Sequence, residues 1–197
     1  YNRGVDKRAI FTSPTEYRRF LCYMFLLNTQ KPIRPADVIE QWGDRSVFGL
    51  ARSEPLVAVG AFCLMPNHLH FLITPLVEGG VSKFMQRIQT AYTMYFNIKH
   101  KRTGALFQGT FKAEHINRDE YNKYLYSYIH LNPAKLIDSS WKEGGAKDFQ
   151  KLRKYIHAYP YSSLGEYISG AHILTDPSKF PKYFLENKEL EDHIDFW

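Results

Sequence analysis

The spacing of hydrophobic residues predicts an alternation of helices and strands. Apolar side chains that recur every three or four positions mark one face of an amphipathic helix, whereas short apolar runs rich in β-branched residues mark strands. Along the chain these patterns predict a strand over 1–11, a helix over 14–28, strands over 56–65 and 68–74, a helix over 81–101, a strand over 107–116 and a helix over 119–131.

The order of these elements is typical of one fold class. Ser13 and Glu16 have the spacing that opens a helix, with Ser13 as the N-cap. Only Pro66 and Asn67 separate the two central strands, which therefore form a predicted β-hairpin. The whole order predicts an α+β protein with a ferredoxin-like (RRM-like) antiparallel sheet, helices on one face, and an extra helix after the sheet.

Two segments fall outside this pattern. Residues 30–54 contain prolines, glycines and a short helical stretch over 36–41, which predicts an insertion. We therefore expect one domain over 1–137, with this insertion, and a C-terminal helical or irregular extension over 138–197. The extension is predicted to contain a loop over 139–145, a helix over 146–158 and a turn over 159–163 before another helix.

Composition narrows the function classes. The chain has 197 residues, of which 44% are hydrophobic and 23% charged, so a disordered protein is excluded. Its longest apolar run, 56–65, is about half of the roughly 20 residues that a membrane-spanning helix needs, so we expect no membrane partner. Cys22 and Cys63 lack metal-type spacing and are expected to be small core residues of a protein in a reducing, cytoplasmic compartment.

The formal net charge of +6 is concentrated in one window. Residues 80–118 contain seven Lys and Arg residues and one acid, Glu114, whereas 184–197 is acidic. Aromatic residues interleave with these cations, as a surface that binds single-stranded nucleic acid requires. A solvated helix face over an aromatic core is the alternative. The candidate cations for such binding are Arg3, Arg87, Lys99, Lys101, Arg102 and Lys112.

Two histidines lie close together on a predicted strand. His68 and His70 are two residues apart, so their side chains point to the same face of the strand. Their Cβ atoms are then about 6–7 Å apart, close enough for both imidazoles to bind one metal ion. Buried or hydrogen-bonded strand histidines would give the same pattern.

Four tyrosines occur within eight residues of the last predicted helix. Helical spacing puts Tyr121, Tyr124 and Tyr128 on one face, and Asn132 continues that row one turn further. Tyr126 lies off the row. The row also fits tyrosines that pack their rings on a sheet with the hydroxyls at its rim.

Together the histidines and tyrosines suggest phosphodiester chemistry. Two imidazoles and a third polar ligand can hold a metal that polarises a phosphate, and a tyrosine hydroxyl can attack that phosphate to form a phosphotyrosine. Because tyrosine is a weak nucleophile with a pKa of about 10, the metal ligands and the nucleophile need to be neighbours.

Two short motifs resemble those of a known enzyme family. Residues 65–73, Met-Pro-Asn-His-Leu-His-Phe-Leu-Ile, resemble the HUH motif of one-tyrosine transposases. Residues 128–133, Tyr-Ile-His-Leu-Asn-Pro, resemble the tyrosine motif of their REP-associated branch. The chain is thus similar to the REP-associated tyrosine transposases, within the IS200-like transposase superfamily. Supporting stretches are 2–5, 104–109 and 161–163.

The resemblance implies roles for four residues. His68 and His70 would be metal ligands for Mg²⁺ or Mn²⁺, and Tyr128 would be the nucleophile. Asn132 would be the third ligand, where the other branch uses Gln one helical turn after the tyrosine. His130 has no counterpart in the motif.

The resemblance also implies an activity. Similar proteins nick single-stranded DNA at hairpins of palindromic repeats, join the 5′ phosphate to the tyrosine and release a 3′ hydroxyl for strand transfer. We therefore expect a cytoplasmic HUH endonuclease, nucleoid-associated when bound to DNA, as a monomer or a homodimer. The alternatives are a domesticated hairpin-binding protein without transposition and a metal-dependent phosphodiesterase.

Overall fold

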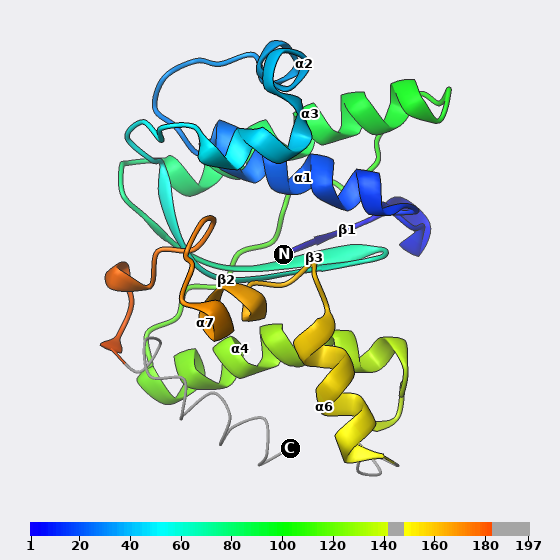
Figure 1. The fold of residues 1–197 in the computed structure, drawn as a ribbon, viewed down its shortest axis with the longest axis vertical. Helices are drawn as coiled ribbons and strands as arrows, with labels where there is room; N and C mark the ends of the chain where they lie inside the picture. Colours follow the sequence, from blue (N-terminus) through cyan, green and yellow to red (C-terminus); the bar gives the residue numbers. More distant parts are fainter. Residues whose placement is uncertain (142–147, 183–197) are drawn as a thin grey trace. The chain divides into compact units, whose positions relative to one another are not determined.

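The computed structural model describes residues 1–141 and 148–182, drawn in sequence colours in Figure 1. They form an α+β fold with a three-stranded antiparallel sheet in the order β1-β3-β2, so the predicted class is confirmed. The strands are β1 (Asn2–Arg3), β2 (Val57–Met65) and β3 (His68–Pro75), and the helices are α1 (Pro14–Leu27), α2 (Pro35–Ser46), α3 (Gly80–Lys99), α4 (Asp119–Leu131), α6 (Phe149–Ala158) and α7 (Leu164–Ser169).

The chain divides into two compact units. Unit 1 comprises residues 1–58, 66–68 and 73–112, and unit 2 comprises 59–65, 69–72 and the described residues from 113 onward. The predicted hairpin is confirmed as β2 and β3, and each of these strands contributes residues to both units. The predicted domain boundary after residue 137 stays a prediction. The acidic 184–197 and part of the predicted 139–145 loop and 146–158 helix lie outside the described residues.

Unit 1 is built around α1 and α3, which lie side by side (Figure 1). The rings of Phe20 and Tyr92 meet edge to face at 5.0 Å between centroids, and Phe11 packs against both. Tyr92 is fully buried and its hydroxyl donates to the Ile10 carbonyl at 2.5 Å. Burial raises the pKa of Tyr92, as expected for a tyrosine in the core.

Glu16 is fully buried at the start of α1. One carboxylate oxygen accepts hydrogen bonds from the backbone N–H and the hydroxyl of Thr12, at 2.5 and 2.9 Å. The other lies 2.7 Å from both Lys99 Nζ and His100 Nε2. Burial by itself raises the pKa of this carboxyl, but the hydrogen bonds from Lys99, Thr12 and His100 outweigh it and lower the pKa to about 2. Glu16 thus ties the start of α1 to the end of α3.

The strand predicted over 107–116 is wrong for the described structure, which contains only an isolated bridge between Gly4 and Phe107 there. The segment still pairs with the N-terminus, because Gln108 N donates to the Arg3 carbonyl and Lys112 N to the Tyr1 carbonyl. Between them Gly109 has a φ of 67°, in the left-handed region. That conformation interrupts the extended backbone and prevents a continuous ladder.

The end of α4 also differs from expectation. Pro133 predicts that Asn132 leaves the α region, yet Asn132 has φ −53° and ψ −38° and opens a 3₁₀ helix, Asn132–Leu136. A proline is tolerated in the first turn of a helix, because its missing N–H has no partner there. The helical direction therefore continues past Tyr128 as far as Leu136.

The core of unit 2 joins α4 to β2. Ala61 and Cys63 of β2 are buried in one cluster with Tyr126 and Ile129 of α4, together with Trp141. Both cysteines are free and buried, as predicted for core residues. Residues 161–163 run along β2, where Leu64 N donates to the Tyr161 carbonyl and Ser163 N donates to the Phe62 carbonyl.

The buried carboxylate of Glu16 predicts a loss of stability in acid. Its pKa is about 2 in the folded protein against an ordinary value of 4.5, so its contribution is complete above pH 4.5 and disappears as the pH falls towards 2. We expect Glu16→Gln to lower the free energy of unfolding in urea by about 3 kcal/mol near neutral pH and to lose less stability than the wild type on acidification. Equal acid dependence in the two proteins would contradict this account.

Candidate active site

The buried face of α4 determines the direction of its tyrosines. Tyr126, Ile129 and His130 are buried in unit 2, which leaves the row predicted from helical spacing on another face of the helix. Tyr121 and Tyr124 stack with ring planes 13° apart, and Tyr124 and Tyr128 stack with planes 21° apart. The predicted row is confirmed.

Tyr128 lies beside one of the two predicted metal-ligating histidines. The ring centroids of His70 and Tyr128 are 5.7 Å apart and their planes are nearly perpendicular, at 88°. Tyr128 is partly buried at the edge of the unit 2 core, and Lys135 Nζ lies 5.4 Å from the centroid of its ring. The fold of unit 2 thus brings an imidazole, a phenol and a cation together.

His68 precedes His70 by two residues in β3, and its neighbours in unit 1 define its tautomer. Asn67 Nδ2 donates to the Lys7 carbonyl at 3.3 Å, which leaves the amide oxygen Oδ1, an acceptor, facing His68. His68 Nδ1 lies 2.6 Å from that oxygen and therefore carries the ring proton. The other ring nitrogen, Nε2, then holds the lone pair that a metal ligand needs.

Asn132 has one polar atom that the protein leaves unsatisfied. Its Nδ2 donates to the Tyr128 carbonyl at 2.8 Å, which holds the side chain against the last turn of α4. Its Oδ1 is buried and has no hydrogen-bond partner. A buried amide oxygen without a partner is costly, and Mg²⁺ and Mn²⁺ take amide oxygens as ligands.

Within unit 2, the His70 imidazole and the Asn132 amide oxygen fit a metal ion, and His68 as a further ligand stays a prediction. Among residues 1–141 and 148–182, no cluster of three or more His, Cys, Asp and Glu side chains could hold a metal ion. Amide oxygens are a further class of ligand. The donor set of imidazoles and one amide oxygen suits Mn²⁺, since imidazole nitrogen binds it more readily than the harder Mg²⁺.

Comparison with known proteins gives one match. Residues 45–132 match the family model of IS200-like transposases. This range covers less than half of the chain but contains His68, His70, Tyr128 and Asn132. The match supports the transposase family, a DNA substrate and a DNA-nicking enzyme in general. No curated protein and no solved structure matches the chain.

The part of the chain that the structure describes has no helix long and apolar enough to cross a membrane.

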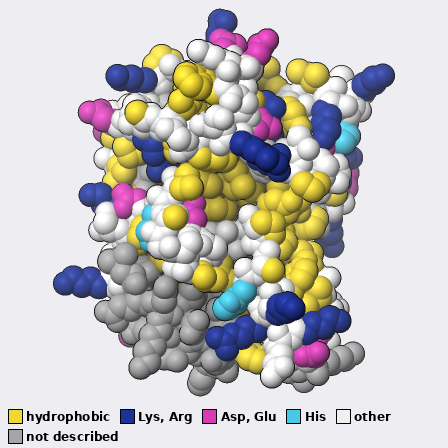
Figure 2. All heavy atoms as spheres, in the orientation of Figure 1, with side chains coloured by type: hydrophobic (Ala, Val, Ile, Leu, Met, Phe, Trp, Pro, Cys, Tyr) yellow, Lys and Arg dark blue, Asp and Glu magenta, His cyan; other side chains and the backbone are white. Residues whose placement is uncertain are grey.

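The candidate DNA-binding cations all belong to unit 1, and three of them make bonds within the protein. Lys99 pairs with Glu16, and Arg87 Nη1 donates to the Thr29 carbonyl at 2.6 Å. Arg102 bonds to the Asn97 side chain and the Ala105 carbonyl. On the face shown in Figure 2, Lys and Arg side chains are dispersed among neutral and hydrophobic ones. The exposed candidates are Arg3, Lys99, Lys101 and Lys112, and the role of all six residues stays a prediction.

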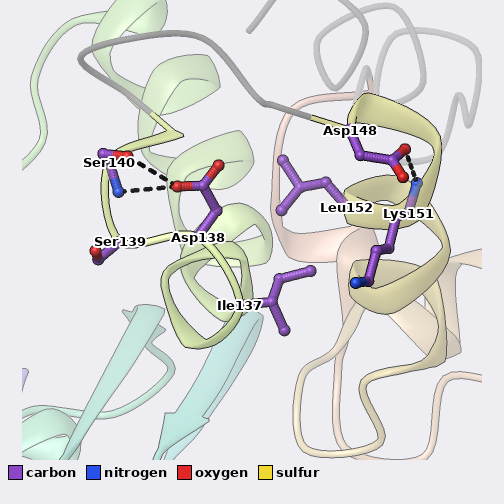
Figure 3. A pocket seen from close by; sticks show the side chains of 7 residues that line it. All are labelled: Ile137, Asp138, Ser139, Ser140, Asp148, Lys151 and Leu152. Carbon is purple, nitrogen blue, oxygen red and sulfur yellow. Dashed lines mark hydrogen bonds between the residues drawn. The ribbon is translucent and has the colours of Figure 1, made fainter.

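A cavity of about 350 Å³ in unit 2 contains none of the predicted site residues. Figure 3 shows Asp138 and Ser140 on one side and Asp148 and Lys151 on the other. Asp138 accepts hydrogen bonds from Ser140, and Asp148 caps α6 by accepting from Lys151 N at 2.9 Å. The carboxylate of Asp138 therefore stabilises a local turn, and that of Asp148 stabilises the start of α6.

Sequence reasoning missed the role of His130. The ring is completely buried, and its Nε2 lies 2.7 Å from Ser163 Oγ, which also accepts from Phe62 N in β2 at 2.9 Å. Burial lowers the pKa of His130 to about 3, although a backbone hydrogen bond with Tyr126 raises it in part. The ring is therefore neutral. Ser163 thus links the tyrosine-bearing helix to β2. The sequence shows that His130 lies two residues after Tyr128, but this spacing does not identify Ser163 as its partner.

Replacing Ser163 should therefore weaken the attachment of α4. Ser163→Ala leaves the buried His130 nitrogen and the Phe62 N–H without their shared partner, so we expect the free energy of unfolding to fall by about 2 kcal/mol in a urea titration. The matched control is Ser82→Ala on the exposed surface of α3, which should change it by less than about 0.5 kcal/mol. Equal effects of the two substitutions would refute this role of Ser163.

Proposed function

We propose that this protein nicks single-stranded DNA and transfers the strand, in the manner of the REP-associated tyrosine transposases, with Tyr128 as nucleophile. The observation that carries the proposal is the contact between the His70 and Tyr128 rings within one unit of one chain. The IS200-like match over the range that contains both residues supports it independently. The substrate would be a hairpin formed by a palindromic repeat.

The proposed reaction exchanges a phosphoester bond of the DNA for a phosphoester bond to Tyr128. The Tyr128 oxygen attacks the scissile phosphorus, the bond from phosphorus to the 3′ oxygen breaks, and the phenol proton leaves to solvent while the 3′ oxygen takes up a proton. The product is a 5′-phosphotyrosine and a free 3′ hydroxyl. Attack by a 3′ hydroxyl on the phosphotyrosine reverses these steps and joins the strands.

Residues of the chain itself orient the nucleophile and provide positive charge near it. His70 packs on the Tyr128 ring and Asn132 is tied to the Tyr128 carbonyl, so both fix the orientation of the nucleophile. The Lys135 ammonium near the same ring adds positive charge where a phosphate would lie. Mg²⁺ or Mn²⁺ held by His68, His70 and Asn132 would supply Lewis-acid polarisation of the phosphate.

The proposal predicts a covalent protein–DNA adduct. Purified protein is incubated with Mn²⁺ and a hairpin oligonucleotide that carries a label on the 3′ side of the cut, and is then run on a denaturing gel. We expect a labelled band at the mass of the protein plus the DNA fragment, lost in Tyr128→Phe and on chelation of the metal, because each removes a required group.

The controls separate this reaction from its alternatives. Tyr155→Phe removes the hydroxyl of another partly buried tyrosine of unit 2 and should leave the adduct intact. Cleaved DNA without an adduct, in both the wild type and Tyr128→Phe, would indicate a metal-dependent phosphodiesterase. Binding without cleavage would indicate a hairpin-binding protein.

A further inference from the structure

The tyrosine row extends from Tyr128 towards the start of α4. Tyr124 is 37% exposed, and its ring centroid lies 5.9 Å from that of Tyr128 and 6.1 Å from that of Tyr121. The three rings are close to parallel. An exposed flat ring therefore lies next to that of the candidate nucleophile and close to parallel with it.

We propose that Tyr124, supported by Tyr121, is a subsite that stacks an unpaired base of single-stranded DNA beside the phosphate bound at Tyr128. The inference rests on the proposed function, because it takes Tyr128 as the residue that meets the DNA strand. It adds a binding residue that the phosphotyrosine chemistry itself does not require.

The geometry suits stacking on a base. Every base has a flat π-face, and base–aromatic stacking does not depend on sequence. Tyr121 stacks on Tyr124 with ring planes 13° apart, and this contact restrains the Tyr124 ring. A platform that is already ordered loses less conformational entropy when a base binds.

The charges around the tyrosine row indicate at which of its ends a phosphate would bind. Three acids, Glu114, Asp119 and Glu120, lie near the start of α4 and outnumber the two cations there, Arg118 and Lys123, so the local net charge disfavours phosphate. Lys135 lies at the opposite end, by Tyr128, where it favours phosphate. The sugar–phosphate backbone is therefore expected at the Tyr128 end and the base over Tyr124. A paired base offers its face to its stacked neighbours, so the occupant is a single strand.

Binding to an oligothymidylate of about 12 nucleotides tests this subsite. Every variant carries Tyr128→Phe, which keeps the ring but prevents the adduct, and fluorescence anisotropy measures the Kd. We expect Tyr124→Ala to weaken binding about tenfold and Tyr124→Phe to leave it within about twofold, because stacking needs the ring and not the hydroxyl. The matched control is Trp42→Ala, which removes a 50% exposed aromatic ring from α2 and should have no effect.

An abasic oligonucleotide of the same length provides the second readout. It keeps the phosphates but has no bases, so its binding should be equal in Tyr124→Ala and its parent. Unchanged oligothymidylate binding in Tyr124→Ala, or equal losses with both oligonucleotides, would overturn the subsite. If the wild type forms no adduct while Tyr124→Ala still loses base-dependent binding, the proposed nicking fails and the stacking subsite stands.

Discussion

Burial of one face of α4 against β2 is the constraint on which the candidate site depends. Tyr126 and Ile129 share a core with Ala61 and Cys63, and Tyr128, which lies between them on the helix, is only partly buried against that core. Tyr128 is therefore held at the edge of the core next to His70 by hydrophobic packing around it. His130 also bonds to Ser163, whose hydroxyl accepts from Phe62 N of the same strand, and this link fixes the orientation of α4 further.

The features of the site that follow from local periodicity could be predicted from the sequence. Residues two apart share a face of a strand, which places His68 and His70 together, and residues three or four apart share a face of a helix, which produces the row from Tyr121 to Tyr128. The hairpin was equally accessible, because Pro66 and Asn67 interrupt two apolar runs. Such patterns depend only on neighbours along the chain.

The features that were missed depend on contacts between distant residues. His130 finds its partner 33 positions away in Ser163, and nothing in its own segment identifies that residue. The segment after Phe107 has the composition of a strand, yet the left-handed Gly109 breaks its pairing. Charge counts likewise cannot show that Lys99 neutralises the buried Glu16. The basic window of the sequence therefore contains structural ion pairs as well as exposed cations.

The proposed reaction depends most on a divalent metal bound beside the Tyr128 ring. NMR of protein with ¹³C-labelled tyrosine rings tests it directly, because Mn²⁺ is paramagnetic and broadens the signals of nearby nuclei, whereas Mg²⁺ is the diamagnetic control. The Tyr128 signal is assigned by its loss in Tyr128→Phe. We expect one equivalent of Mn²⁺ to broaden the Tyr128 signal more than any other tyrosine signal, and His70→Ala to abolish the effect. A Tyr128 signal that stays sharp at saturating Mn²⁺ would contradict it.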